Sequence, residues 1–463
     1  MKTYKRVHFI GIGGIGMSAM AKLLKVCGTY VSGSDVQDSE TIRELRHMSV
    51  QIGIGSKPEL IGKDVELIVY SSAVPLDDEE RIRGRHLDIP EITYNAFLGE
   101  VSQGSNLIAV TGTHGKSTTT AMLGHILTVA GLDPTVVVGS KVTSFPYGNL
   151  RVGMSDVFVA EACEHMAHML HMDPQMIVLT NIEFDHPDFY GSVEDVRAAM
   201  KQFVEKLPQG GTLVWNADDA QSQLLIKEIA LSRSDIQLIA YGQDAAAHAE
   251  VEREVGIQRV HLFKEDAEVF EADLRYPGDY NVHNAMMAAL AASALHVRGD
   301  KIKQALESFP GLWRRFEHLG LWKGADVYSD YGHHPTAVAS LLEGVKSFLP
   351  GKRIVLCFQP HQHARTRGLF NEFVQSMEEA DVVVLQEIYD VAGRNEQDHA
   401  TSSAELVEAI HESDTTRGVD RDVIYAQDAE AVKFQLEKIV RPGDVLLMVG
   451  AGDIDRLART LIK

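Results

Sequence analysis

The chain of 463 residues is 45% hydrophobic and 24% charged, which is typical of globular domains, and its length favours about three of them. Acidic residues outnumber basic residues by 65 to 44, and the formal charge of −21 argues against nucleic acid as a partner because phosphate backbones would be repelled. The three cysteines have no zinc-binding spacing, and no segment has the apolar length of a signal peptide or a membrane span. We therefore expect a cytoplasmic protein that is not inserted into a membrane.

The first 105 residues predict a small parallel sheet, because short apolar runs alternate with segments of helical periodicity. Strands are expected at Arg6–Ile10, Tyr30–Ser34, Leu67–Ser71 and Ile92–Tyr94. A helix should follow the turn after the first strand and end at about Cys27. A polar joint at Ser102–Asn106 indicates the end of this domain, which we place at residues 1–105.

Residues 106–311 restart the pattern of strand, glycine turn and helix, with the helix over Lys116–Ala130. Strands are expected at Leu107–Thr111, Val157–Glu161, Met176–Thr180, Thr212–Trp215 and Leu238–Tyr241. Short alternating runs at Arg259–Phe263 and Ala267–Phe270 predict an antiparallel hairpin. A helix over Asn281–His296 closes the domain, and Pro310 with Gly311 indicates a linker.

Residues 312–463 form the third predicted domain, again with strands separated by helices. Its strands are expected at Asp326–Ser329, Arg353–Phe358, Val382–Gln386, Val423–Tyr425 and Val445–Val449. The predicted fold class is therefore α/β in all three domains.

A first glycine-rich loop, Gly11-Ile12-Gly13-Gly14-Ile15-Gly16, lies between a predicted strand and a helix. Such glycines let backbone N–H groups approach a diphosphate at the positive end of the helix. Asp35 ends the next strand, where a carboxylate can bind a ribose hydroxyl. The pattern indicates a dinucleotide or a nucleotide-diphosphate site and does not distinguish them; a tight turn without a ligand is the structural alternative.

A second loop, Thr111-Gly112-Thr113-His114-Gly115-Lys116-Ser117, has the same strand–loop–helix context. Its backbone amides can cradle phosphates, Lys116 can neutralise the β and γ oxygens, and Ser117 can bind Mg²⁺. Val110 stands where the usual phosphate-loop pattern has its first glycine, so Gly112 is expected to supply the bend. A dehydrogenase would need only the first loop and an ordinary ATPase only the second. A chain with both loops therefore fits neither class alone.

With both loops, the chain resembles the Mur ligase family over essentially its whole length. The shared motifs are His8–Ser18, Gly112–Thr120, Thr180–His186, Tyr280–Ala285, Arg314–Glu317, Asp330–Thr336, Phe358–His361 with Arg365–Arg367, and Gly450–Asp453. The resemblance implies a Rossmann-like N-terminal domain, a central P-loop ATPase-like domain and a Rossmann-like C-terminal domain.

The reaction implied by the resemblance is ATP-dependent amide formation in peptidoglycan precursor synthesis. The lactyl carboxylate of UDP-N-acetylmuramate attacks the γ-phosphate of ATP to give an acyl phosphate, and the amine of L-alanine then displaces phosphate. The first domain would bind the UDP-sugar, the second ATP, and the third the amino acid while closing over the others. A monomer or homodimer is expected.

The resemblance also assigns site residues. The reaction brings a carboxylate and a triphosphate together, so cations must offset the charge of both groups and hold them in line. The catalytic set is Lys116, Glu161, His186 and Arg315. The Mg²⁺ (or Mn²⁺) ligands are Ser117, Glu161 and His186. The ATP contacts are Gly112, Thr113, His114, Gly115, Lys116, Ser117, Thr118, Asn284, Arg315 and Asp330. The UDP-sugar contacts are Gly11, Gly13, Gly14, Gly16, Ser34, Asp35, Ser71 and Ser72. The L-alanine contacts are His333, His334, His361, Arg365 and Arg367.

Several of these residues have a purely structural alternative. Glu161 could be a surface strand end, His186 a turn histidine, and Asp330 a cap. Asn281 and Asn284 could be helix caps, and the basic residues near Arg365 a solvated edge.

The chain departs from the family pattern at two places. Glu161-Ala162-Cys163-Glu164, followed by His165-Met166-Ala167-His168, replaces the usual Glu-Ala-Asp-Glu. Gln362 and Ala364 remove one cation near the expected alanine pocket. Three functional alternatives stay open: a recycling ligase that attaches the L-Ala-γ-D-Glu-diaminopimelate tripeptide, an NAD-dependent dehydrogenase, and a non-catalytic nucleotide sensor.

Overall fold

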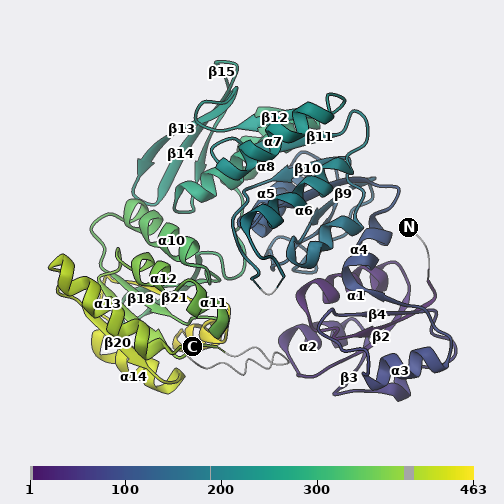
Figure 1. Ribbon diagram of the computed structural model, residues 1–463, viewed down its shortest axis with the longest axis horizontal. Helices are drawn as coiled ribbons and strands as arrows, with labels where there is room; N and C mark the ends of the chain where they lie inside the picture. Colours follow the sequence, from purple (N-terminus) through teal and green to yellow (C-terminus); the bar gives the residue numbers. More distant parts are fainter. Residues whose placement is uncertain (1–3, 188, 390–400, 463) are drawn as a thin grey trace. The chain divides into compact units, whose positions relative to one another are not determined.

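The computed structural model describes residues 4–187, 189–389 and 401–462 (Figure 1). The chain divides into two compact units. The first comprises Met1–Ala249, Leu262–Phe270 and His283–Pro310, and the second comprises Glu250–His261, Glu271–Val282 and Gly311–Lys463. No helix among the described residues combines the length and apolar character needed to cross a membrane.

The N-terminal sheet is parallel, with the order β3-β2-β1-β4-β5. Its strands are β1 (Arg6–Ile10), β2 (Tyr30–Asp35), β3 (Gln51–Ile54), β4 (Leu67–Tyr70) and β5 (Glu91–Thr93). Its helices are α1 (Ile15–Val26), α2 (Glu40–His47), α3 (Glu79–His86) and α4 (Tyr94–Ser102), with the 3₁₀ turn η1 (Pro58–Leu60). Tyr94, predicted to end a strand, instead begins α4, because the Thr93 side chain caps that helix by accepting from the N–H of Ala96.

The central sheet has ten strands in the order β15-β14-β13-β12-β11-β10-β6-β9-β7-β8. They are β6 (Asn106–Thr111), β7 (Thr135–Val137), β8 (Leu150–Arg151), β9 (Val157–Glu161), β10 (Met176–Leu179), β11 (Thr212–Asn216), β12 (Gln237–Tyr241), β13 (Ala247–Glu254), β14 (Ile257–Lys264) and β15 (Ala267–Leu274). The helical segments are α5 (Lys116–Val129), η2 (His165–His171), α6 (Val193–Glu205), α7 (Ala220–Ser232), α8 (Asp279–Ala294) and α9 (Gly299–Glu307). The strands from β9 to β12 that flank β6 are parallel, so their carboxyl ends share one edge, where the second glycine loop lies.

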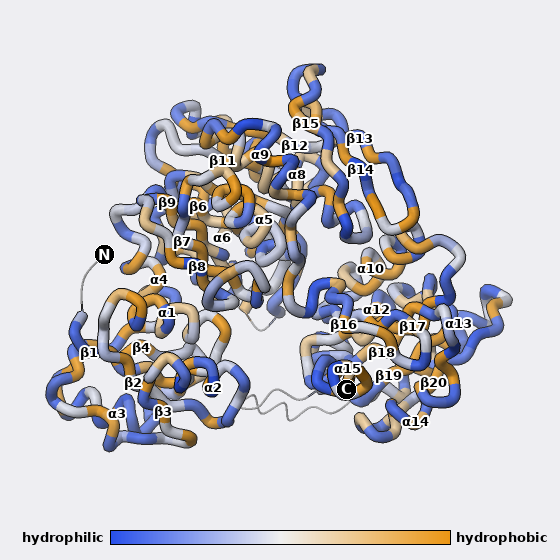
Figure 2. The backbone as a smooth tube through the Cα atoms, turned by 180° about the vertical axis from the view of Figure 1, so that it is seen from behind, coloured by the Kyte–Doolittle hydropathy of each residue, from blue (hydrophilic) through white to orange (hydrophobic). Residues whose placement is uncertain are grey.

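The C-terminal sheet has the order β16-β17-β21-β18-β19-β20 and is parallel except for β16. Its strands are β16 (Glu317–Trp322), β17 (Ala325–Asp330), β18 (Ile354–Phe358), β19 (Val382–Gln386), β20 (Asp422–Ala426) and β21 (Val445–Val449). Its helices are α10 (Pro335–Phe348), α11 (His363–Gly368), α12 (Phe370–Ser376), α13 (Ser403–Arg417), α14 (Ala429–Ile439) and α15 (Ile454–Leu461). The inner strand β18 consists only of buried apolar residues, and the tube is orange around its label (Figure 2).

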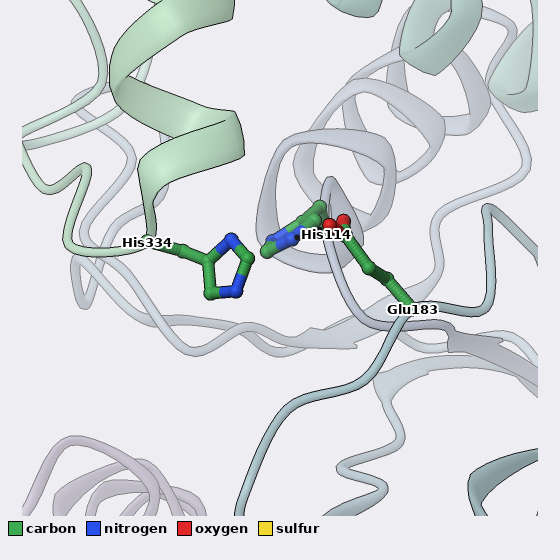
Figure 3. Close-up of side chains that lie close together, drawn as sticks. All are labelled: His114, Glu183 and His334. Carbon is green, nitrogen blue, oxygen red and sulfur yellow. Dashed lines mark ion pairs between the residues drawn. The ribbon is translucent and has the colours of Figure 1, made fainter. Parts of the chain in front are cut away.

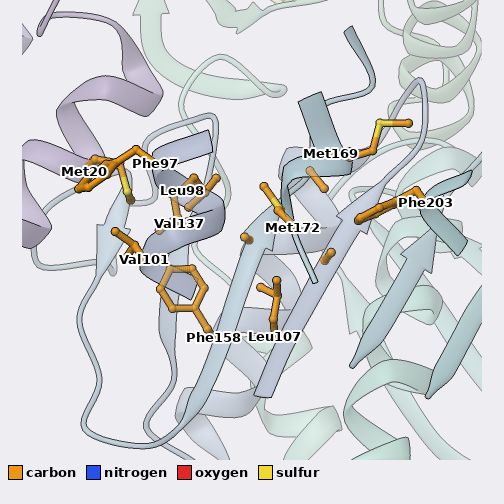
Figure 4. Packing of buried hydrophobic residues seen from close by; sticks show 14 of the residues in the cluster. Met20, Phe97, Leu98, Val101, Leu107, Val137, Phe158, Met169, Met172 and Phe203 are labelled. Atoms are coloured by element: carbon orange, nitrogen blue, oxygen red, sulfur yellow. The ribbon is translucent and has the colours of Figure 1, made fainter. Parts of the chain in front are cut away.

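The largest core of the first unit is continuous between the N-terminal and central sheets. Phe97 and Leu98 of α4, Phe158 of β9 and Met169 of η2 belong to one buried cluster, part of which is drawn in Figure 4. Burying one such large apolar side chain stabilises the folded state by about 1.5–3 kcal/mol relative to leaving it exposed to water. In the second unit, two clusters contain residues from alternating positions of the C-terminal strands, as expected of a sheet covered on both faces.

The predicted fold class is confirmed, since all three regions are α/β and their sheets are mainly parallel. The helix predicted over Asn281–His296 begins two residues earlier, at Asp279, so Asn281 and Asn284 lie inside α8 and do not cap it.

Candidate functional site

The first glycine loop joins β1 to α1 at the carboxyl edge of the N-terminal sheet. The N–H groups of Gly11 and Ile12 both donate to the carbonyl of Ser34, which closes the turn. Asp35 accepts from the N–H of Gly13 at 2.8 Å, so in this conformation its carboxylate stabilises the loop that was predicted to bind a diphosphate. Gly14 is the N-terminal cap residue of α1 and has no side chain to fill the space before the helix.

The other predicted UDP-sugar residues surround this loop to different extents. Ser71 follows β4, and a Cβ on Gly11 would lie 3.2 Å from that of Ser71, whereas Ser72 is exposed. Gly16 packs so closely against the ring of Tyr94 that a side chain there would overlap the phenol. Tyr94 therefore belongs to the surroundings of this loop, although no motif in the sequence points to it.

A buried polar chain lies beneath the loop and was not predicted. His8 contacts Ser32 through Nδ1 at 2.9 Å and Glu80 through Nε2 at 3.1 Å. Ser34 donates to the second oxygen of Glu80, and all four side chains are at most 3% exposed. Because the Ser34 hydrogen is used in this bond, the hydroxyl oxygen can only accept further hydrogen bonds. The only available sequence signal was a histidine within an otherwise apolar strand.

The second loop contains two positions that require glycine. Gly112 has φ +129°, and a Cβ there would overlap Thr180 Oγ1 and crowd the backbone of Asn181. Gly115 has φ +82°, and a Cβ there would overlap the side-chain oxygen of Asn284. The prediction that Gly112 supplies the bend is therefore confirmed, since this conformation is unfavourable for other residues.

Asn284 is brought to the same loop from α8. Its Oδ1 accepts from Thr119 Oγ1 at 3.2 Å, and it lies five residues after α8 begins at Asp279. The position is consistent with the predicted contact near the nucleotide and excludes the capping alternative.

The segment after β10 fixes the outer side of the loop. The N–H of His114 donates to Asn181 Oδ1 at 2.9 Å, and Thr113 exchanges two hydrogen bonds with the backbone of Glu183. The His114 ring also lies 3.0 Å from the Glu183 carboxylate, and both side chains are drawn in Figure 3. Ser117 and Thr118, in the first turn of α5 directly after the loop, are buried, with 7% and 8% of their surface exposed.

Lys116 is held by oxygen atoms on all sides. Its Nζ donates to the carbonyls of Gly112 at 2.6 Å and Thr113 at 3.0 Å, and to Glu164 Oε1 at 2.9 Å. Burial alone would lower the pKa of Lys116, but the charge of Glu164 and the hydrogen bond to it hold that pKa above its usual value. Burial would likewise raise the pKa of Glu164, and the charge of Lys116 with hydrogen bonds from His186 and Lys116 lowers it instead. Both groups are therefore ionised at neutral pH.

The predicted metal ligands are only partly gathered. His186 Nε2 lies 3.4 Å from Glu164 Oε1, whereas Glu161 accepts from the N–H of Gly139 at 2.7 Å. In the described part of the chain, the ligand atoms of Glu161, Glu164 and His186 do not all lie within 4.8 Å of one another. Glu164 Oε2 is buried and has no hydrogen-bond donor, although Lys116 Nζ lies 2.8 Å away as an ion pair. Carboxylate oxygens with this spare capacity suit a divalent cation, so the residues present fit Mg²⁺ or Mn²⁺ in their donor chemistry.

The histidine and methionine run after Glu164 has a structural explanation. Met169 and Met172 are fully buried in the core, and the ring of His165 stacks on that of His186 at 4.4 Å. The segment turns sharply, since Met166 and Ala167 have left-handed φ values of 52° and 54°. The Tyr190 hydroxyl donates to the carbonyl of Glu164 at 2.6 Å and fixes the start of the turn.

Arg315 and Asp330 lie together in the C-terminal region. Asp330 accepts from the N–H groups of Phe316 at 2.8 Å and Gly332 at 2.7 Å, so it stabilises a turn and does not cap a helix. Burial raises the pKa of Asp330, and the charge of Arg315 opposes that shift. The Arg315 guanidinium also lies over the ring of Tyr331, 5.1 Å from its centre.

The predicted alanine-binding residues fall into two environments. His333 and His361 approach each other, with ring centres 6.2 Å apart, and His361 stacks on Tyr389. His334 is 3% exposed and precedes Pro335 at the start of α10. Arg365 is 5% exposed whereas Arg367, two residues later on α11, is exposed, because residues two apart do not share a helix face.

The remaining C-terminal motif lies near Arg314. The Arg314 guanidinium donates to the carbonyls of Gly450 and Gly452, and Gln359 donates to Asp453 at 2.8 Å. Motifs that are about 140 residues apart in sequence therefore form one turn cluster, as expected at the carboxyl ends of parallel strands.

In comparisons with known proteins, three family models match successive parts of the chain. The Mur ligase family catalytic domain matches residues 6–106, the Mur ligase middle domain residues 110–292, and the Mur ligase glutamate ligase domain residues 314–452. Together they cover most of the chain.

Curated relatives are similar over their full lengths. A UDP-N-acetylmuramate–L-alanine ligase from Clostridium kluyveri is 37% identical, covering 97% of this chain and 96% of the relative. The Clostridium novyi protein of the same name is also 37% identical, covering 99% and 97%.

Solved structures show the same architecture. The UDP-N-acetylmuramate–alanine ligase from Thermotoga maritima is 27% identical with a TM-score of 0.82, covering 99% of this chain and 98% of that one. A murein peptide ligase from Psychrobacter arcticus, at 22% identity and a TM-score of 0.70 over 99% of this chain and 98% of that one, shares the fold. With three family models matched in order and relatives 37% identical over nearly the whole chain, the chain belongs to the Mur ligase family.

Proposed function

We propose that this protein is an ATP-dependent ligase that joins L-alanine to the lactyl carboxylate of UDP-N-acetylmuramate, giving ADP and phosphate, in peptidoglycan precursor synthesis. The observation that carries the proposal is the 35–37% identity, over the whole chain, to relatives that bear this name. The two glycine loops support it, because this reaction needs one site for a UDP-sugar and another for ATP.

In this proposal residues 1–105 bind the UDP-sugar, residues 106–311 bind ATP, and residues 312–463 bind L-alanine and close over the other two. Ser34 and the Gly11–Gly16 loop face the UDP diphosphate, which makes NAD unnecessary as an explanation of that loop. Asn284 and Asp330 lie on the ATP side, and Arg365 with His361 meets the amino acid, where a buried arginine can bind a carboxylate by two parallel hydrogen bonds.

The chemistry proceeds in two steps. A carboxylate oxygen of the UDP-sugar attacks the γ-phosphorus of ATP, the bond to the ADP oxygen breaks, and an acyl phosphate results. The alanine nitrogen then attacks the acyl carbon, loses a proton and expels phosphate. Lys116 and Arg315 offset the charge of the two reacting anions and hold them in line. Mg²⁺ or Mn²⁺, when bound near Ser117, Glu161 and His186, would add positive charge between donor and acceptor.

The proposed compartment is the cytoplasm, since Cys27, Cys163 and Cys357 are free thiols, as expected under reducing conditions.

The decisive measurement is ADP release with UDP-N-acetylmuramate and a panel of amines: L-alanine, glycine, L-serine and the L-Ala-γ-D-Glu-diaminopimelate tripeptide. L-Alanine should give the highest kcat/KM. Glycine should be poorer by about 10- to 200-fold, because a pocket that fits one methyl group discriminates by only about 1–3 kcal/mol. Efficient use of the tripeptide with negligible use of L-alanine would contradict the proposal. Lys116→Ala, which should release no ADP, serves as the negative control.

A further inference from the structure

Glu164 occupies an unusual position between the phosphate loop and the predicted metal ligands. Its side chain is 2% exposed, one oxygen lies 2.9 Å from Lys116 Nζ and 3.4 Å from His186 Nε2, and the other lies 2.8 Å from the same Nζ. Glu164 belongs to none of the predicted sets of site residues, although it contacts two members of the predicted catalytic set, Lys116 and His186.

The lysine has no donor to spare in this arrangement. An ammonium group has three N–H bonds, and those of Lys116 are directed to Gly112 O, Thr113 O and Glu164. A triphosphate that enters the loop must therefore take Lys116 from at least one of these oxygens. The two carbonyls are part of the loop, so the displaced oxygen should be that of Glu164.

Displacement alone would leave two anions side by side in a buried place. The carboxylate cannot turn to solvent, because the Glu164 side chain is 2% exposed and its backbone carbonyl is held by the Tyr190 hydroxyl. A buried carboxylate without a cation is strongly unfavourable. A divalent cation that bridges phosphate and carboxylate would remove the conflict. Glu164 Oε2, which faces the Lys116 ammonium at 2.8 Å while the loop is empty, can bind that cation once the lysine turns to the phosphate.

We propose that Glu164 makes nucleotide binding depend on a divalent cation: it holds Lys116 while the loop is empty and binds the cation, beside His186, when ATP is present. This inference rests on the proposed use of ATP. It adds a carboxylate to the predicted ligands Ser117, Glu161 and His186. It also explains why a buried acid follows Cys163.

The test compares ATP affinity with and without Mg²⁺, by titration calorimetry, in the full-length protein without UDP-sugar or amino acid. For the wild type, Mg²⁺ should tighten ATP binding strongly. In Glu164→Gln, ATP in the presence of EDTA should bind about tenfold more tightly than to the wild type, because the phosphate no longer competes with a carboxylate for Lys116. The ratio of the two dissociation constants should fall by tenfold or more.

Three variants make the result specific. Glu164→Ala should behave as Glu164→Gln does, and it replaces that variant if the glutamine protein does not fold. Glu164→Asp, which keeps the charge, should retain the metal dependence to within about threefold. Glu183→Gln is the matched control, since Glu183 is also a carboxylate beside this loop but pairs with His114 and not with Lys116. Mn²⁺ binding in the presence of ADP, followed by electron paramagnetic resonance, should weaken in Glu164→Gln.

An unchanged ratio in Glu164→Gln, or an equal fall in Glu183→Gln, would overturn the inference and leave the proposed function intact. Failure of the wild type to bind ATP even with Mg²⁺ would overturn both.

Discussion

Four histidines lie in or next to the segment that follows Glu164, and one of them has a strongly shifted pKa. Burial, followed by the charges of His165, His171 and His186, lowers the pKa of His168 to about 4, from an ordinary value of 6.5. Such a histidine makes the free energy of unfolding depend on pH. Stability falls with decreasing pH if the unfolded chain binds the proton more readily than the folded protein does.

The first prediction concerns this residue. The unfolded chain takes up a proton on His168 near its ordinary pKa of 6.5, whereas the folded protein does so only at about 4. Stability from this residue is therefore fully present above pH 6.5 and is lost as the pH falls from 6.5 toward 4. In His168→Gln, the thermal midpoint should fall less between about pH 7 and about pH 5 than it does in the wild type. Identical slopes in the two proteins would show that His168 is not the group responsible. His318→Gln is the control, because that histidine is half exposed and lies outside this segment.

At the scale of single residues, sequence alone located both loops but not the contacts beneath them. Lys116 and Gly112 were predicted because fixed spacing between a strand and a helix limits what such residues can do. Glu164, His8 and Glu80 could not be selected, since their importance depends on burial and on partners 48 to 72 residues away. Spacing within a motif carries no information about either.

Among the elements, the loop between β6 and α5 has the most restricted backbone of the site. Gly112 fills a position with φ +129° against Thr180 and Asn181, so both conformation and space exclude a side chain. Gly131, after α5, also has a left-handed φ of +83°, but a Cβ there would meet nothing within 4 Å.

This contrast gives the second prediction. Gly112→Ala should abolish ATP binding and cost more stability than Gly131→Ala, which should cost only the left-handed strain of about 1–2 kcal/mol. UDP-sugar binding should be nearly unchanged in both variants, because the first loop lies in another sheet. Calorimetric titration with each nucleotide and thermal unfolding would provide the measurements. Normal ATP affinity in Gly112→Ala would show that the loop does not hold the nucleotide.

Elements with long apolar runs were predicted well, and elements with mixed patterns were not. The buried strands β9, β18 and β21 matched their predicted ranges within one residue, since continuous apolar runs between turns favour buried parallel strands. The edge strand β16 was missed because it is antiparallel and partly exposed, with a register shift between His318 and Gly320. Its sequence, Glu317–Trp322, has no regular alternation.

At the scale of the whole molecule, a buried lysine of the first unit connects the N-terminal and central sheets. It links α1 to the loop between β7 and β8. Lys22 is 2% exposed, and its Nζ donates to Glu44 at 2.9 Å, to the carbonyl of Tyr147 at 2.9 Å and to Asn149 Oδ1 at 3.1 Å. Asn149 donates in turn to Ser18 at 3.0 Å. On sequence alone Lys22 looks like an ordinary surface residue of an amphipathic helix.

The third prediction follows from this network. Lys22→Met keeps the apolar stem but removes the donor from the buried Asn149 Oδ1 and from the part-buried Tyr147 carbonyl, while Glu44 keeps its bond to Lys141. The loss should lower stability by about 1–3 kcal/mol. Lys25→Met, on the same helix but less buried, should change stability by less than about 0.5 kcal/mol. Denaturant titration of both variants would separate them. Equal stabilities would mean that solvent replaces the lost bonds and that the two sheets do not depend on Lys22.

The thiol of Cys163 has a practical consequence for inhibitor chemistry. Burial, followed by the charge of Glu164, raises its pKa to about 12, so it stays protonated at neutral pH although it is adjacent to Glu164 in the sequence. Electrophilic compounds react with thiolates and not with thiols. Burial also raises the pKa of Cys27, but this thiol is exposed at the end of α1, so an electrophile should reach it before Cys163. Maleimide reagents should therefore label the protein at Cys27 before they modify Cys163 next to Glu164.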